Sequence, residues 1–104
     1  MKIAFSVNGV PTKLTEKQLK HIYNNHPEMK TEEDRILETV SNPNLVQQGD
    51  VGSLLAIKKF DKTPVTNNKY LNVAYKEPTQ TEGFVLTAFY SNKLKNRKII
   101  WENK

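Results

Sequence analysis

The stretch from Tyr70 to Tyr90 holds the densest run of strand-forming residues in this chain, and it constrains the fold more than any other segment. Residues 70–76 and 84–90 are rich in aromatic and β-branched side chains, which fit a pleated, partly buried surface. Between them, Pro78 and Gly83 are residues typical of turns. The sequence therefore predicts a β-hairpin. Because an isolated hairpin is marginally stable in water, we also expect further strands beside it and helices across one face.

Side-chain alternation distinguishes the two strands of this hairpin. In residues 70–76 the odd-numbered positions are apolar and form the face expected to pack on the core, which leaves Lys76 on the opposite, polar face. In residues 84–90 both faces are mostly apolar, so this strand is predicted to be central. Its interior has one polar side chain, Thr87. Threonine is a good strand former and its hydroxyl can bond to the backbone, so Thr87 can also be an ordinary strand residue without a functional role.

The order of elements along the chain predicts an α+β domain. Residues 2–7 alternate as a short edge strand before a tight turn, so residues 1–10 are expected to form an extra N-terminal strand. A helix is predicted from Glu16 to Asn25, with Thr15 as its cap, and a second helix is predicted to begin after a cap at Thr31. Strands over 53–60 and 99–101 complete an antiparallel meander around the hairpin, in a single domain of 1–104.

Composition limits the classes of function. The chain has no cysteine, which excludes disulfides, thiolate metal sites and cysteine catalysis. No segment has membrane-spanning length and no secretion signal is visible, so we expect a cytoplasmic protein with no membrane partner. Sixteen Lys and Arg against 11 Asp and Glu give a net charge of +5, which favours a polyanionic partner. Five acidic residues lie between positions 28 and 38, whereas five basic residues lie between positions 93 and 104, so the positive charge is unevenly distributed toward the C-terminal end.

The two histidines, His21 and His26, are the first candidates for chemistry because they lie five residues apart around the end of the predicted first helix. Cleavage of RNA by internal transfer needs one group to remove the 2′-hydroxyl proton and another to protonate the departing 5′-oxygen, and imidazoles suit both roles. A nearby cation stabilises the charge on phosphorus. Alternation makes Lys76 the best-placed cation, with Lys58 second.

Other interpretations of the histidines remain open. His21 can fill the contact between helix and sheet, and His26 can cap a turn. A zinc site would need Glu28 or another carboxylate to complete it. The sequence contains no glycine-rich phosphate loop, no nucleophile elbow and no paired-carboxylate motif, so the hydrolase classes that those motifs mark have no support.

Four blocks of sequence together resemble a known family. They are His26-Pro27-Glu28-Met29, residues 39–43 (Thr-Val-Ser-Asn-Pro), residues 70–76 (Tyr-Leu-Asn-Val-Ala-Tyr-Lys) and residues 83–90 (Gly-Phe-Val-Leu-Thr-Ala-Phe-Tyr). In order and spacing these blocks are similar to the phage and mobile-element branch of the barnase, EndoU, colicin and RelE-like (BECR) nucleases. The similarity runs from about residue 21 to residue 101, and residues 1–10 have no counterpart in it.

The resemblance implies a BECR-like fold, with N-terminal helices packed on an antiparallel sheet of about four strands. It also implies ribonuclease chemistry on the open face of the sheet, without a metal or other cofactor. By this resemblance His21 and His26 take the acid–base roles, Lys76 the cationic role, and Thr87 contacts the phosphate or the leaving group. Lys58, Tyr90 and Tyr75 are expected as neighbouring substrate-binding residues.

The sequence therefore leads to three hypotheses of function, of which the last, a structural phage or mobile-element protein with no nucleic-acid role, would show neither RNA binding nor cleavage. The first is a toxin-like endoribonuclease or phage or mobile-element effector that cleaves RNA (tRNA or mRNA) by 2′-hydroxyl attack. Such a protein would be inhibited by an antitoxin or immunity protein. The second is a non-catalytic RNA-binding or protein-interaction domain that uses the same face. Binding to RNA that depends steeply on salt, without cleavage, would select the second.

Overall fold

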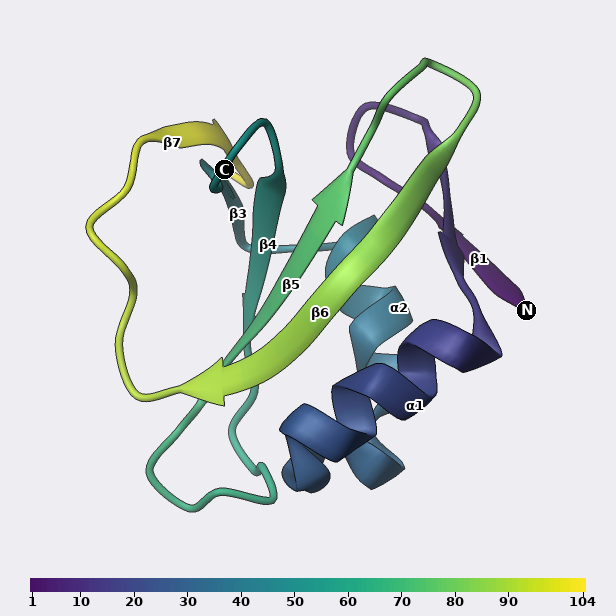
Figure 1. The fold of residues 1–104 in the computed structure, drawn as a ribbon. Coiled ribbons are helices and arrows are strands. Elements are labelled where there is room, and N and C mark those ends of the chain that lie inside the picture. Colours follow the sequence, from purple (N-terminus) through teal and green to yellow (C-terminus); the bar gives the residue numbers. More distant parts are fainter.

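The computed structural model describes all residues from 1 to 104, as two α-helices, one 3₁₀ helix and a single sheet (Figure 1). The elements, in chain order, are β1 (Lys2–Phe5), β2 (Pro11–Leu14), α1 (Glu16–Asn25), the 3₁₀ helix η1 (Pro27–Thr31), α2 (Glu33–Ser41), β3 (Leu45–Gln48), β4 (Leu54–Lys59), β5 (Tyr70–Lys76), β6 (Gly83–Ser91) and β7 (Ile99–Glu102).

The sheet is larger than predicted, and it is mixed. Its seven strands lie in the order β1-β2-β6-β5-β4-β3-β7, and all neighbours are antiparallel except β2 and β6, which are parallel. The prediction of an antiparallel sheet of about four strands is therefore wrong. The extra strand over residues 1–10 joins the same sheet as β1, and β2 and β3 were not counted. The parallel pairing comes from β2: the chain reverses at Gly9, where φ is +78°, so that β2 runs back along β1 and then pairs with the start of β6.

The first helix begins and ends where the sequence places it. Thr15 accepts a hydrogen bond from the backbone N–H of Gln18 at 3.1 Å, whereas the Gln18 amide bonds to the carbonyl of Leu86 on β6 instead of returning to the cap. The second helix differs from expectation, because Pro27 starts a 3₁₀ turn that ends at Thr31. Thr31 therefore does not cap α2, whose N-cap is Glu32.

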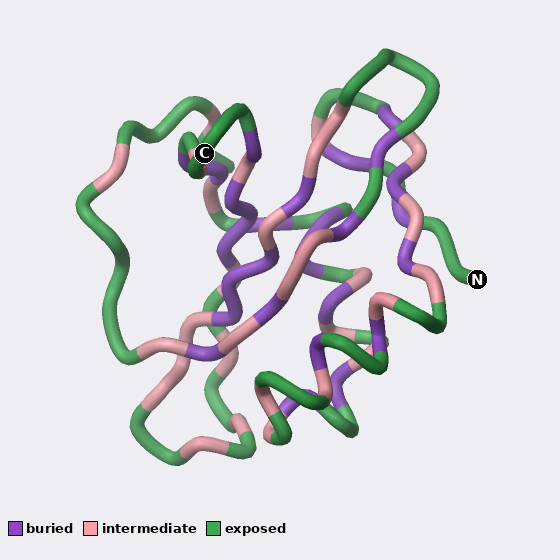
Figure 2. The backbone as a smooth tube through the Cα atoms, viewed as in Figure 1, coloured by how far each residue is buried: buried purple, intermediate pink, exposed green.

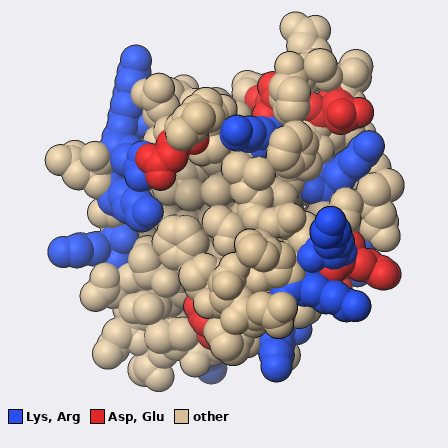
Figure 3. Space-filling view, in the orientation of Figure 1, with Lys and Arg blue, Asp and Glu red and all other residues tan.

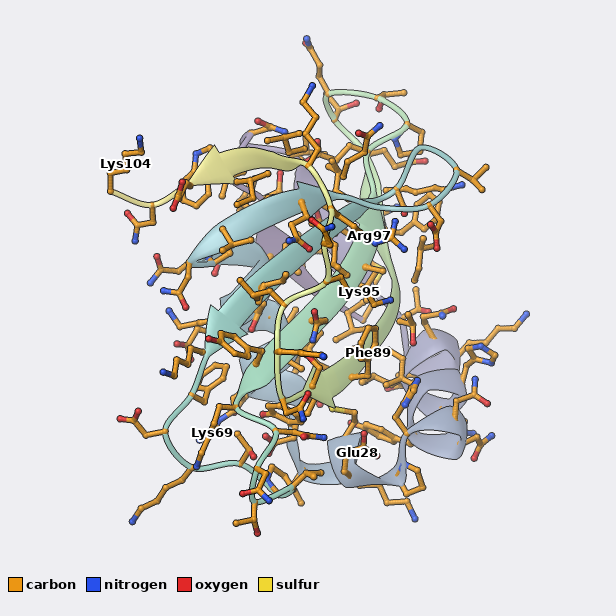
Figure 4. The ribbon with its side chains drawn as sticks, turned by 90° about the vertical axis from the view of Figure 1, so that its left-hand side faces the viewer. Glu28, Lys69, Phe89, Lys95, Arg97 and Lys104 are labelled. Carbon is orange, nitrogen blue, oxygen red and sulfur yellow. The ribbon has the colours of Figure 1, made fainter.

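Helices cover one face of the sheet, called here the covered face, and the main core lies between them. It contains Leu19 and Ile22 of α1, Met29 of η1, Ile36 and Val40 of α2, and strand residues that include Leu71, Val73, Val85 and Ala88. Figure 2 shows these elements buried where they face one another, while most of the connection from β6 to β7 is exposed. The other face is called here the open face, and part of it lies beneath residues 92–98, which cross it in Figure 4.

A β-bulge in β6 changes which side chains share a face. Ala74 pairs with Thr87 but Tyr75 pairs with Val85, so Leu86 is an extra residue in the strand. Val85 consequently joins the core on the covered face, although strict alternation would place it on the face of Thr87. The bulge leaves Thr87 and Phe89 together on the open face, where each is half-buried.

Candidate functional site

A cleft of about 190 Å³ opens on the open face of the sheet. Thr87 and Phe89 of β6 form its floor together with Leu55 of β4 and Ala74 of β5. Lys95 and Arg97 lie along one wall, and the β3–β4 turn contributes Gly49, Asp50 and Ser53. Figure 4 shows Arg97, Lys95 and Phe89 one above another on this face, with Glu28 beyond Phe89.

The phenyl ring of Phe89 joins the cleft to the end of the first helix. The His26 ring lies against it, with ring centroids 5.7 Å apart and an interplanar angle of 31°. The ammonium group of Lys95 lies 5.2 Å from the centroid of the same ring, within the range of a cation–π interaction. One aromatic side chain thus contacts both an imidazole and an ammonium group; Phe89 and Lys95 line the cleft, and His26 lies beside it.

His26 owes its position to the local sequence. It is the C-cap of α1, where its backbone N–H donates to the carbonyl of Ile22, and Pro27 starts the next turn immediately after it. Nδ1 of His26 lies 3.9 Å from a carboxylate oxygen of Glu28, and about a third of the His26 side chain is exposed. The carboxylate therefore faces one ring nitrogen, which leaves Nε2 as the nitrogen for a substrate.

The connection between β6 and β7 is anchored to the sheet at several points. The amide nitrogen of Gln47 on β3 donates to the carbonyl of Lys95 at 2.9 Å, and the backbone N–H of Gln48 donates to the carbonyl of Lys98 at 2.8 Å. Arg97 forms an ion pair with Asp50 at 2.9 Å. These contacts hold Lys95 over the cleft although its side chain is exposed. Figure 3 shows basic side chains gathered where this connection lies.

His21, the other predicted acid–base residue, lies elsewhere on α1. It is exposed, and its Nε2 lies 3.1 Å from the amide nitrogen of Asn25, one helical turn further on. The buried positions of the helix, Leu19 and Ile22, point toward the sheet, whereas His21 is not among the residues that line the cleft. The structure therefore brings His26, but not His21, to the Phe89 ring.

Lys76 and Thr87 share the open face. Thr87 lines the cleft, and its register partner Ala74 lies two residues before Lys76 on β5, a separation of about 7 Å along a strand. Lys76 is half-buried and forms no ion pair. The cationic group nearest to the Phe89 ring is Lys95, however, which was not a predicted site residue.

The remaining predicted residues, Lys58, Tyr75 and Tyr90, lie on the covered face. Lys58 donates to the carbonyl of Asn42 at 2.9 Å and pairs with Glu38 of α2 at 3.7 Å. Tyr75 is fully buried, and burial raises the pKa of its phenol far above the ordinary range. None of the three shares a face with Thr87.

Tyr90 is part of a buried polar network between sheet and helices. Its hydroxyl donates to the Glu32 carboxylate at 2.5 Å and lies 3.3 Å from a guanidinium nitrogen of Arg35. Burial, followed by the hydrogen bond to Glu32, raises the pKa of Tyr90 to about 12. Arg35 also donates to the carbonyl of Lys62 at 2.7 Å, so the network ties α2 to the loop between β4 and β5. The contacts of Tyr90 are therefore structural.

A second, larger hollow of about 670 Å³ lies between the β1–β2 turn and the β5–β6 turn. Its six lining residues include one carboxylate, Glu77, and no cation. Such a surface does not suit a polyanion, so we place the candidate site at the cleft by Phe89.

Sequence reasoning missed Phe89, Lys95, Arg97 and Asp50 as site residues. Two signals pointed toward them: Phe89 is two positions from Thr87 on an alternating strand, and five basic residues lie between positions 93 and 104. The sequence did not reveal that residues 92–98 fold back over the sheet, because that depends on tertiary contacts such as Gln47 with Lys95.

Two further searches of the structure bear on the site and its setting. No three side chains among His, Asp and Glu come together as a group able to hold a metal ion. No helix is long and apolar enough to cross a membrane. Comparison of the chain with family models, curated proteins and solved structures finds no match, so the candidate site is defined by its own geometry.

Proposed function

We propose that this protein is an endoribonuclease that cleaves RNA by attack of the ribose 2′-hydroxyl, with His26 as its catalytic residue. The observation that carries the proposal is the position of His26 and Lys95, which both contact the Phe89 ring beside the cleft that Thr87 lines. A cation and a hydroxyl at a cleft, with a proton donor beside it, are the groups that phosphoryl transfer uses.

The chemistry assigns a separate role to each group. A solvent water molecule takes the proton of the 2′-hydroxyl as the 2′-oxygen attacks phosphorus. The bond to the 5′-oxygen breaks, Nε2 of His26 donates a proton to the departing oxygen, and the imidazole then regains a proton from solvent. Glu28 faces Nδ1 and orients the ring, so it is a positioning residue. Lys95 and the Thr87 hydroxyl stabilise the negative charge that develops on the phosphoryl oxygens. The product is a 2′,3′-cyclic phosphate and a free 5′-hydroxyl.

The proposal keeps the chemistry that the resemblance of residues 21–101 to the BECR nucleases implies, although the sheet of about four strands that it also implies is wrong. The resemblance implies His26 and Thr87 as site residues, and both lie at the cleft or at the ring that borders it. His21 has no place in the proposed chemistry, because its ring contacts Asn25 rather than the Phe89 ring. Lys95 takes the principal cationic role, and Lys76 is a further cation on the same face.

The experiment that tests the proposal is incubation of purified protein with total cellular RNA in EDTA, followed by mapping of the RNA ends. We expect discrete cuts by the wild type that carry 2′,3′-cyclic phosphates, and a 10²- to 10⁴-fold slower reaction for His26→Gln, the usual contribution of a general acid. Intact RNA with the wild type, combined with binding that depends steeply on salt, would contradict cleavage and select the non-catalytic RNA-binding alternative.

A cellular test addresses the toxin-like part of the proposal. If the protein cleaves the RNA of its own cell, induced expression of the wild type arrests growth and His26→Gln relieves the arrest at equal protein level. An antitoxin or immunity protein would then be required for tolerance of the active protein. Equal growth with both proteins, alongside cleavage in vitro, would show that the target RNA lies outside the expressing cell.

A further inference from the structure

A row of basic and apolar side chains extends from the cleft to the free edge of β1. The register pairs Ile3 of β1 with Lys13 of β2, Lys13 with Phe84 of β6, and Phe84 with Lys76 of β5. These four residues, called here the cross-strand row, therefore lie side by side across four strands, over about 14 Å at ordinary strand spacing. Phe5 follows Ile3 on the same face of β1, since alternate residues share a face.

The cross-strand row lies on the open face. The intervening residues Ala4 and Leu14 are buried in the core on the covered face, so Ile3, Phe5 and Lys13 point the other way. Three of these apolar side chains are accessible to solvent: Phe84 is 36% exposed, Ile3 48% and Phe5 61%. Large apolar side chains grouped on an otherwise charged surface are typical of a binding site.

The charges of the row point to an anionic partner. Lys13, Lys76 and Lys95 form no ion pair, whereas two lysines of the covered face are paired with carboxylates, Lys2 with Glu33 at 3.4 Å and Lys58 with Glu38 at 3.7 Å. The charges of these three lysines are thus not neutralised within the protein, whereas Arg97 on the same face is paired with Asp50. Lysines interleaved with exposed phenylalanines suit a single-stranded nucleic acid, because the lysines attract phosphates while bases stack on the rings.

We infer that single-stranded RNA lies across the open face, with bases stacked on Phe84 and Phe5 and the strand leading into the cleft at Thr87. This inference rests on the proposed ribonuclease and specifies its substrate as unpaired RNA. It also gives a function to the N-terminal hairpin of β1 and β2, which supplies Phe5 and Lys13. A duplex keeps its bases stacked on one another, so it cannot use the phenylalanines in this way.

The test measures binding separately from cleavage. The probes are a fluorescent 12-nucleotide single-stranded RNA, the same sequence as DNA, and the same RNA as a duplex, each titrated with His26→Gln protein by anisotropy. Stacking contributes about 1–3 kcal/mol per base, so Phe84→Ala and Phe5→Ala should each weaken single-strand binding about 5- to 150-fold. Neither residue belongs to the hydrophobic core.

The matched control is Ile100→Ala, which removes an apolar side chain on β7, at the opposite edge of the sheet, whose exposure of 47% lies between those of Phe84 and Phe5. We expect it to leave binding unchanged and duplex RNA to bind more weakly than single strands. Unchanged single-strand binding by Phe84→Ala and Phe5→Ala, or equal affinity for the duplex, would overturn the inference even if the wild type cleaves RNA. Weakened binding by both variants without cleavage would leave the inference standing and reject the ribonuclease.

A second copy of the chain is the main competing occupant of this face, since β1 is an edge strand with exposed Ile3 and Phe5. Light scattering on the wild type and on Phe5→Ala measures the mass in solution. A monomer in both is expected. A wild-type dimer that Phe5→Ala dissociates would assign the row to self-association and overturn the inference.

Discussion

The unpaired lysines of the open face predict a specific loss of salt dependence in RNA binding. Each lysine–phosphate contact to a single strand contributes about 0.7 to the slope of log K against log salt. Lys13, Lys76 and Lys95 have no carboxylate partner, so all three are free to contact phosphates. Replacing all three with Gln should lower the slope by about 2. Between 50 and 200 mM salt, the wild type should therefore lose roughly 20-fold more affinity for RNA than the triple variant.

A variant with the same change in net charge separates direct lysine–phosphate contact from general electrostatic attraction between protein and RNA. Lys2, Lys17 and Lys20 lie on β1 and α1, and Lys2 is already paired with Glu33. Replacing these three with Gln gives the same net charge of +2, from the formal +5 of the wild type less three. The assay is fluorescence anisotropy with single-stranded RNA at four salt concentrations. An equal fall in slope in both triple variants, or no fall in the first, would refute a lysine path on the open face.

Two predictions concern stability. Tyr90→Phe removes the hydroxyl that donates to the buried Glu32 carboxylate and should cost about 1–3 kcal/mol in urea unfolding. Because the folded pKa of Tyr90 is raised from 10.0 to about 12, its contribution is complete below pH 10 and lost as pH rises through 12. The free energy of unfolding of Tyr90→Phe should therefore fall less between pH 10 and pH 12 than that of the wild type. The same pH dependence in both proteins would contradict this role of Tyr90. Gly83→Ala places a Cβ 3.0 Å from the Lys76 carbonyl and from Thr12 Oγ1, where β2 meets β6. This crowding should lower the free energy of unfolding by about 1–3 kcal/mol. Unfolding at the same urea midpoint as the wild type would show that the strands adjust freely.

Local sequence signals located several elements accurately. The first helix runs from Glu16 to Asn25 as predicted, because the Thr15 cap, the helical spacing of Leu19 and Ile22 and the stop at Pro27 all act within one short segment. The hairpin of β5 and β6 and the edge strand β1 follow from alternation in the same way. These elements are determined by residues close to one another in the chain.

Features that depend on distant contacts were not predicted. β2 is only four residues long and begins with Pro11, so its strand conformation depends on β1 and β6 on either side. Alternation places Asn72 on the polar face, yet it is fully buried and its amide nitrogen donates to Ser91 Oγ at 2.9 Å. The bulge at Leu86 likewise depends on register with β5.

Only part of the candidate site was predicted, because some of its residues are also positioned by distant contacts. His26 and Thr87 are fixed by a helix end and a strand face, both visible in sequence. Lys95 reaches the cleft through a chain reversal after β6, and sequence periodicity contains no information about where an irregular segment returns. The placement of Lys58 on the covered face follows from the register of β4 with β5.

A comparison of the two histidines tests the central proposal most directly. His21 and His26 are the same residue type, five positions apart, but only His26 contacts the Phe89 ring at the cleft. The measurement is the initial rate of RNA cleavage in EDTA by His21→Gln and by His26→Gln at equal folded concentration, checked by circular dichroism. The proposal predicts a wild-type rate for His21→Gln and a loss of at least 10²-fold for His26→Gln. Equal rates in the two variants, whether both active or both inactive, would contradict catalysis by His26 alone at the open face.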